Sequence, residues 1–386
     1  MPMLRRCRAL LMPLLATCVA VPGVCAGAVQ APPASTSSSQ AARTAELRAR
    51  AEQGDAAAQL SLGLAYAIGQ GVPRDHAQAA AWYRRAAEQG KALAQLNLGW
   101  CYRVGQGVPR DLGLAADWYR RAAEQGEPTA QFELGSLYAS GEGVPLDEVQ
   151  AAVWFRKAAE QGEASAQFRL GMALANGRGV GRDAAQAVAW LRKSAAQGKA
   201  AAEFMMGVML EQGRGVAQDH AEAVRWYRRA ADQGDATARL NLGACYETGR
   251  GVPQDYGLAA AWYRLAAEQG DVRAQANLAH AYAAGRGVER DYAQAAAWFR
   301  KAADQGHAPS QFDLGELYAR SLGVPRNDVE ACRWLLIAES RAASPEDRAA
   351  YGAARERVAR RMSAAQLAEA QQLARDWIEA FAGRAK

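Results

Sequence analysis

The chain has 386 residues, half of them apolar, and a formal net charge of +6 at neutral pH. Three of the six net positive charges come from Arg5, Arg6 and Arg8, so the rest of the chain is only weakly basic. Recognition of nucleic acid needs a concentrated basic stripe, and we therefore expect no nucleic-acid partner. The length alone would fit two average domains, but an internal repeat replaces that estimate.

Residues 1–28 have the features of a secretory signal peptide. The three arginines form a basic start, Ala9–Ala20 is a short apolar stretch, and the Ala-Gly-Ala sequence at 26–28 fits the rule for cleavage between small residues. We expect cleavage after Ala28. The mature protein would then be periplasmic or secreted, in a Gram-negative bacterium.

Two other interpretations of the N-terminus are less favoured. The apolar stretch is shorter than the roughly 20 residues of a membrane-spanning helix, so we expect no transmembrane segment after signal removal. Leu15-Ala16-Thr17-Cys18 resembles a lipoprotein box, but the residues that follow Cys18 are apolar. A lipid anchor there is the minor alternative.

The next two segments lead into the repeat. Residues 29–40 contain Pro32, Pro33 and a Ser/Thr run, which predict a flexible linker. Residues 41–53 read as a single helix that closes with the same Ala-Glu-Gln-Gly sequence as the helices further along the chain. We expect this helix to cap the N-terminal end.

Residues 54–341 consist of eight 36-residue copies of one unit, without insertion or deletion. The copies open at Gly54, Gly90, Gly126, Gly162, Gly198, Gly234, Gly270 and Gly306. A fixed period of this size indicates a solenoid, in which each unit buries its apolar face against its neighbours. The predicted fold is all-α: an α/α superhelical solenoid of eight helix pairs with capping helices.

Each unit reads as two helices joined by a turn. In the first unit they run from about Ala56 to Ile68 and from His76 to Gln89. Gly69 ends the first helix, since glycine adopts the left-handed C-terminal conformation without penalty, and Asp75 is placed to cap the second. Gly63, within the first helix, predicts close approach of a neighbouring helix.

One tryptophan recurs in the second helix of every unit. It is Trp82 in the first copy and Trp190 in the fourth, each surrounded by alanines. A single large aromatic at a fixed position per unit predicts a packing residue between adjacent helices rather than a ligand-binding one.

The recurring pattern is A-x-x-x-L-G, then Y-x-x-G-x-G-V-P-x-D, then A-x-x-W-Y-R-x-A-A-x-Q-G. It resembles the Sel1-like repeat, a relative of the tetratricopeptide repeat, over about three quarters of the chain. The resemblance implies an α/α superhelix in which the first helix of each pair lines the concave side. It also implies a scaffold or adaptor that binds a protein or peptide and is not an enzyme.

The repeat pattern fades toward the C-terminus. Ser321 and Asn327 replace the usual Gly and Asp of the last unit, as terminal repeats often deviate. Residues 342–386 then predict two capping helices, which begin after Ser344 and Ser363.

No motif for catalysis, metal or cofactor binding is found. Cys101 and Cys245 are equivalent residues four units apart, too distant for a disulfide, and Cys332 is single; we expect all three to be buried apolar residues. No His-x-x-x-His, paired Cys-x-x-Cys or Gly-x-Ser-x-Gly occurs. We expect no catalytic residue, no metal, no cofactor and a monomer.

Two alternative functions remain open. A cell-wall enzyme or β-lactam-binding protein is disfavoured, because the cysteine pairs within each repeat that the resemblance associates with β-lactam binding are absent. A secreted effector that acts on host proteins would have the same fold and a different destination.

The predicted binding face comes from comparing the units with one another. On the first helix, the sites held by Ala57, Ser61, Leu64 and Ile68 vary between units and are spaced four, three and four residues apart, so they share one helical face. Exposed apolar residues in a row often mark a partner site, and asparagine can clamp a peptide backbone. The predicted protein- or peptide-binding residues are Leu64, Ile68, Asn97, Trp100, Val104, Arg169, Met172, Met205, Asn241, Arg273, Asn277, His280 and Arg320.

Overall fold

The computed structural model describes residues 34–384, and within this range it contains nineteen helices and no strand. In chain order the helices are α1 (Ala34–Glu52), α2 (Ala56–Ile68), α3 (His76–Glu88), α4 (Ala92–Val104), α5 (Leu112–Glu124), α6 (Pro128–Ser140), α7 (Glu148–Glu160), α8 (Ala164–Asn176), α9 (Ala184–Ala196), α10 (Ala200–Gln212), α11 (His220–Asp232), α12 (Ala236–Thr248), α13 (Tyr256–Glu268), α14 (Val272–Ala284), α15 (Tyr292–Asp304), α16 (Ala308–Arg320), α17 (Asp328–Ser340), α18 (Pro345–Ala359) and α19 (Ala364–Arg384). The predicted signal peptide lies outside the described residues.

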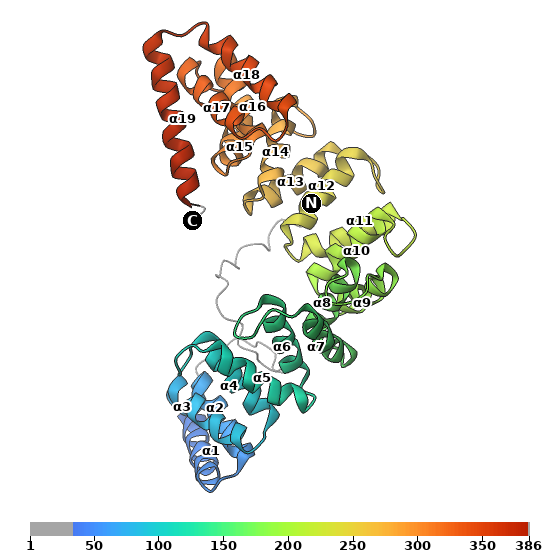
Figure 1. The fold of residues 1–386 in the computed structure, drawn as a ribbon, viewed down its shortest axis with the longest axis vertical. Helices are drawn as coiled ribbons and strands as arrows, with labels where there is room; N and C mark the ends of the chain where they lie inside the picture. Colours follow the sequence, from blue (N-terminus) through green and yellow to red (C-terminus); the bar gives the residue numbers. More distant parts are fainter. Residues whose placement is uncertain (1–33, 385–386) are drawn as a thin grey trace.

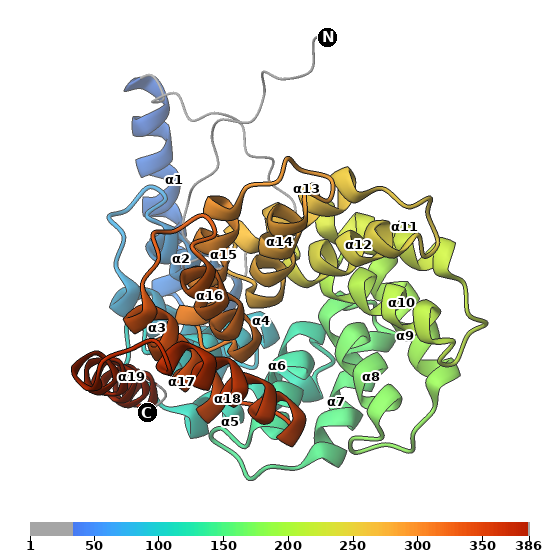
Figure 2. The same cartoon turned by 90° about the horizontal axis from the view of Figure 1, so that it is seen from above.

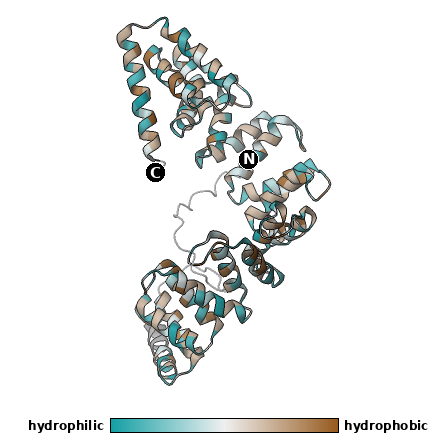
Figure 3. Ribbon diagram, in the orientation of Figure 1, coloured by the Kyte–Doolittle hydropathy of each residue, from teal (hydrophilic) through white to brown (hydrophobic). Residues whose placement is uncertain are grey.

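The helices α2 to α17 form eight consecutive pairs stacked into one superhelix (Figure 1). The view from above shows α6, α8, α10, α12 and α14, each the first helix of its pair, nearer the centre of the ring than their partners (Figure 2). The predicted α/α solenoid is therefore confirmed. Hydrophobic and hydrophilic residues are interleaved along the helices (Figure 3), and the buried apolar residues form successive clusters rather than one central core.

Local signals in the sequence set the helix ends. The Asp75 carboxylate accepts hydrogen bonds from the backbone N–H groups of Ala77 and Gln78, which begins α3 as predicted. Gly69 ends α2 at φ 79°, where a residue with a Cβ would be strained. The same two signals recur in the next six units, and Ser321 and Asn327 take their places in the last one, so all sixteen helices of the pairs have thirteen residues.

In seven of the eight pairs, a glycine in the first helix faces an aromatic or leucine side chain of the second. A Cβ on Gly63 would lie 2.6 Å from the Tyr83 ring, and one on Gly207 would lie 2.5 Å from the Tyr227 ring. This close approach confirms the reason expected for the recurring glycine, and it places that aromatic or leucine side chain of the second helix between the two helices of the pair.

The tryptophans pack at the junctions, but their depth varies. Trp334 is fully buried, whereas Trp190 is half-buried and packs against the edge of a core cluster. The Lys193 ammonium lies 4.0 Å from the centroid of the Trp190 ring and covers its outer side. The packing role is confirmed, while the most deeply buried aromatic in most pairs is the residue that follows the tryptophan.

Glutamine side chains join consecutive units at one edge of the superhelix. The buried Gln131 side chain donates from Nε2 to the carbonyl oxygen of Ala123 at 3.1 Å and accepts from Gln161 Nε2 at 2.8 Å. Equivalent pairs of glutamines recur along the solenoid. These bonds satisfy backbone carbonyls at the ends of the second helices, which would otherwise lack a partner.

The N-terminal cap is longer than expected. The helix α1 begins at Ala34, so part of the predicted linker at 29–40 is helical. No glycine or proline follows Pro33 until Gly54, and serine and threonine each disfavour a helix by only a few tenths of a kcal/mol. The predicted boundary at Ala41 was therefore wrong by seven residues.

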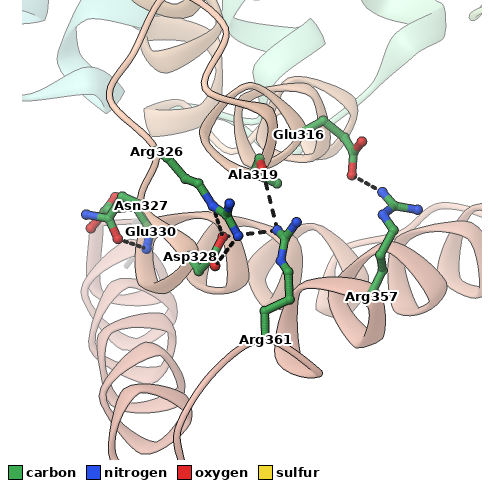
Figure 4. A network of polar contacts seen from close by, with 8 residues as sticks. All are labelled: Glu316, Ala319, Arg326, Asn327, Asp328, Glu330, Arg357 and Arg361. Atoms are coloured by element: carbon green, nitrogen blue, oxygen red, sulfur yellow. Dashed lines mark hydrogen bonds and ion pairs between the residues drawn. The ribbon is translucent and has the colours of Figure 1, made fainter.

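The C-terminal helices α18 and α19 are both present and cover the last pair. Arg361, just after the end of α18, is 3.0 Å from the Asp328 carboxylate at the start of α17, and Arg357 of α18 pairs with Glu316 of α16 (Figure 4). On α19, the Trp377 ring contacts the Trp334 ring with the centroids 6.0 Å apart. Basic side chains here thus hold the cap in place.

Candidate functional site

The predicted binding residues all lie on the first helices of the pairs, and none of them is fully buried. They are Leu64 and Ile68 on α2; Asn97, Trp100 and Val104 on α4; Arg169 and Met172 on α8; Met205 on α10; Asn241 on α12; Arg273, Asn277 and His280 on α14; and Arg320 on α16. We call this the inner face. A role for these residues in binding stays a prediction.

An apolar strip occupies the inner face of the first two pairs. Leu64 is 42% exposed and Ile68 is 63% exposed on α2, while Leu93 and Val104 of α4 are 48% and 45% exposed. Trp100 is half-buried and packs against the neighbouring core cluster. Because a soluble surface seldom leaves large apolar side chains grouped in this way, the strip is a candidate contact surface.

Two of the three asparagines of the inner face have partners within the solenoid. Asn241 hydrogen-bonds the hydroxyl of Tyr227 in the preceding pair, and Asn277 does the same with Tyr263. The Tyr227 hydroxyl also donates to Glu211 at 2.7 Å. Contact between units is thus a sufficient reason for asparagine at these two sites, besides the predicted peptide binding.

The positions equivalent to Glu211 and Asn241 hold different residues on α4 and α6. Arg103 takes the place of Glu211, and Glu133 takes the place of Asn241. Arg103 and Glu133 form an ion pair, and the buried hydroxyl of Tyr119 beside them has no hydrogen-bond partner. Burial raises the pKa of Glu133, against the opposing effect of Arg103.

Sequence reasoning missed this group of residues. The signal was present, because one repeat position holds Arg103, Glu211 and Glu247 in different units while most other units have alanine there. A position that switches between alanine, arginine and glutamate is not required by packing. Its partners, however, lie 16 and 30 residues away, in another helix and another unit.

A polar cleft of about 690 Å³ lies at the C-terminal end of the inner face. His280, Asp313, Glu316 and Arg320 line it together with Phe299. His280 Nε2 is 3.4 Å from Asp313 Oδ2, and the His280 ring stacks edge-on against Phe299. Burial raises the pKa of Asp313 to about 6, although His280 acts in the opposite direction.

The middle of the inner face has a smaller hollow of about 370 Å³. Arg169 and Met172 line it, with Phe168 and Arg178 at its sides. The structure therefore divides nine of the thirteen predicted residues among an apolar strip, a small mixed hollow and a polar cleft, instead of bringing them together in one site. Asn97, Met205, Asn241 and Arg273 lie on the inner face outside these three features.

Cysteine chemistry finds no support. Cys101, Cys245 and Cys332 are free and buried, as expected. Burial raises the pKa of Cys101 to about 12 and that of Cys245 to about 11, so their thiols remain protonated at neutral pH.

No group of three or more His, Cys, Asp or Glu side chains within residues 34–384 could hold a metal ion. None of the helices described for this chain combines the length and the apolar character needed to cross a bilayer.

Comparison with known proteins agrees with the architecture. The model of the Sel1 repeat family matches eight consecutive segments, at residues 56–91, 92–127, 128–163, 164–199, 200–235, 236–271, 272–307 and 308–341. A search of curated protein sequences gives no match.

Two solved structures are similar over most of their length. One is c5321, described as a protective antigen of uropathogenic Escherichia coli with an SLR fold; it is 34% identical, with a TM-score of 0.60, over 89% of this chain and 81% of that one. The other, a Sel1 repeat protein from Oxalobacter formigenes, is 38% identical, with a TM-score of 0.61, over 78% of this chain and 87% of that one.

Proposed function

This chain belongs to the Sel1 repeat family, and we propose that it is an exported scaffold that binds a protein or peptide on its inner face. A repeat solenoid of this kind suggests a platform for protein–protein interaction. We infer that the protein acts without catalysis, without a cofactor and as a monomer.

The apolar strip is the observation that carries the proposal. It combines four exposed aliphatic side chains with Trp100, on helices whose packing faces are already satisfied within the solenoid. Large apolar residues on an otherwise polar surface are typical of partner sites, and tryptophan is enriched among residues that dominate binding energy. The strip therefore supports binding better than a purely structural role.

Export is the second part of the proposal and rests on residues 1–28. The basic start, the short apolar stretch and the Ala-Gly-Ala sequence support a cleaved leader. N-terminal sequencing of protein from the cell envelope should begin near Val29. Protein there that still starts at Met1 would overturn export by this route, and a lipid on Cys18 would favour an anchored form.

Affinity capture tests the scaffold directly. The mature protein, immobilised through its C-terminus, should retain a protein from its own cell envelope, whereas a variant with Leu64, Trp100 and Val104 changed to serine should not. The variant must first show unchanged helicity, so that lost binding is not lost folding. Equal retention by both proteins would place binding away from the apolar strip.

A further inference from the structure

The buried hydroxyl of Tyr119 differs from its equivalents along the inner face. Tyr227 and Tyr263 donate to Glu211 and Glu247 at 2.7 Å and 2.6 Å. Tyr119 is fully buried and its hydroxyl has no partner. A buried hydroxyl without a hydrogen bond is unfavourable, so this site is the one of the three whose polar groups are not satisfied.

An acceptor for that hydroxyl is close by and is held elsewhere. Glu133 occupies the position equivalent to Asn241, whose side chain reaches the Tyr227 hydroxyl. The negative charge of Glu133 contributes to the raised pKa of Tyr119. In the structure, however, Glu133 pairs with Arg103. The Glu133 carboxylate therefore has two alternative partners, the Arg103 guanidinium and the Tyr119 hydroxyl.

Arg103 is the accessible member of this group. Its side chain is 36% exposed, whereas the Glu133 side chain is 11% exposed. Arg103 lies on α4, one turn from Trp100 and next to Val104, at the end of the apolar strip that faces α6. A peptide that follows the strip from α2 to α4 therefore reaches the Arg103 guanidinium before it can reach the Glu133 carboxylate.

We propose that the apolar strip and Arg103 together bind a peptide segment that has apolar side chains next to a carboxylate. The carboxylate, from an Asp or Glu side chain or a chain terminus, pairs with the Arg103 guanidinium. The Glu133 carboxylate then turns to accept a hydrogen bond from the Tyr119 hydroxyl, which gives this buried hydroxyl a partner. This inference rests on the proposed scaffold function and names the chemistry of its partner.

The charges argue against other occupants. A cationic segment would need Glu133, which is nearly covered, and would be repelled by Arg103. A uniformly anionic polymer would leave Leu64, Ile68 and Trp100 without apolar contacts. A segment that is apolar first and acidic at one end fits both parts of the surface.

Selection from a random peptide library on the purified protein tests the chemistry. We expect retained peptides to be rich in apolar residues followed by Asp, Glu or a free C-terminus. Loss of a charge-assisted hydrogen bond should weaken their binding about tenfold or more in Arg103→Gln. Binding should not change in Arg225→Gln, which alters an exposed arginine on the outer helix α11.

The outcomes separate this inference from the proposed function. Retained peptides without a carboxylate, or equal binding to Arg103→Gln, would overturn the inference and leave the scaffold function standing. Capture of a folded partner with no peptide retained would do the same. If neither peptide nor protein binds the inner face, both proposals fail.

Tyr119→Phe tests the movement of Glu133. In the free protein the hydroxyl has no partner, so the folding midpoint should not fall. Peptide affinity should fall, because Glu133 then has no partner once Arg103 is taken. Tyr227→Phe is the matched control, with reduced stability and unchanged affinity. Unchanged affinity in Tyr119→Phe would overturn the exchange of partners.

Discussion

Tyr227 and Glu211 are joined by a hydrogen bond of 2.7 Å between the two helices of one pair. Burial is the main cause that raises the pKa of Tyr227, and the adjacent carboxylate raises it further, so the phenol remains a donor. Glu211 also lies 3.3 Å from Arg250 of the following unit. Glu211 thus links the interior of one pair to the following unit.

Removal of the Tyr227 hydroxyl should therefore destabilise the solenoid. We expect Tyr227→Phe to lower the free energy of unfolding by about 1–3 kcal/mol, because the bond has a charged acceptor in a buried setting. Chemical denaturation followed by circular dichroism would measure it. The matched change Tyr119→Phe should cost nothing, and equal losses in both variants would contradict the assignment.

The second prediction follows from how deeply each tryptophan side chain is buried. Trp334→Ala should cost about 3–5 kcal/mol, the usual loss for a buried aromatic residue, because its side chain is fully covered. Trp190→Ala should cost less, since that ring is half-buried and shielded on one side by Lys193. Denaturation midpoints in the reverse order would show that position in the solenoid matters more than burial.

The period of the sequence was enough to predict the solenoid, since seven of the eight turns within the pairs carry their own glycines and their own capping aspartate. Burial was harder to predict: Trp190 and Tyr227 are both large aromatics in second helices, yet only Tyr227 is fully covered. That difference depends on the glycine opposite the ring, in another helix.

The candidate site could be predicted only in part. Variation between units identified the inner face, but the pairing of Arg103 with Glu133 connects different units, and no local pattern encodes it. Likewise, the sequence predicted that Asn241 binds a peptide backbone, because its contact with Tyr227 of the preceding unit is visible only in the fold. Comparing the residues at one repeat position can identify an exposed helical face, whereas the contacts between different positions can be found only from the folded structure.

Asp313 should make stability depend on pH. Its pKa is raised from 3.8 to about 6 in the folded protein, so the folded state binds more protons than the unfolded state between these values. Stability should therefore fall as the pH rises from about 4 to about 6. Asp313→Asn should remove this slope and be more stable at pH 7, on the order of 1–2 kcal/mol after allowance for partial exposure.

Denaturation of both proteins at pH 4.5 and pH 7 would check this prediction. His280 and Glu316 also face Asp313 and affect its titration, so His280→Gln is the control that separates their contributions. A parent protein whose stability rises over this range would contradict the prediction, because it would mean that Asp313 is stabilised in its charged form.

The final prediction concerns Trp100, whose equivalent in the preceding unit is Leu64. Trp100→Leu restores a residue that this repeat already accommodates, so the folding midpoint should change little. Binding should weaken at least tenfold, because a tryptophan at an interface often contributes 2 kcal/mol or more. Titration of a captured partner and thermal melting of the same sample would measure both. Leu64→Trp should not weaken binding, which makes it the reciprocal control. If Trp100→Leu melts earlier and binds unchanged, the ring serves packing alone, and the partner must contact another part of the inner face.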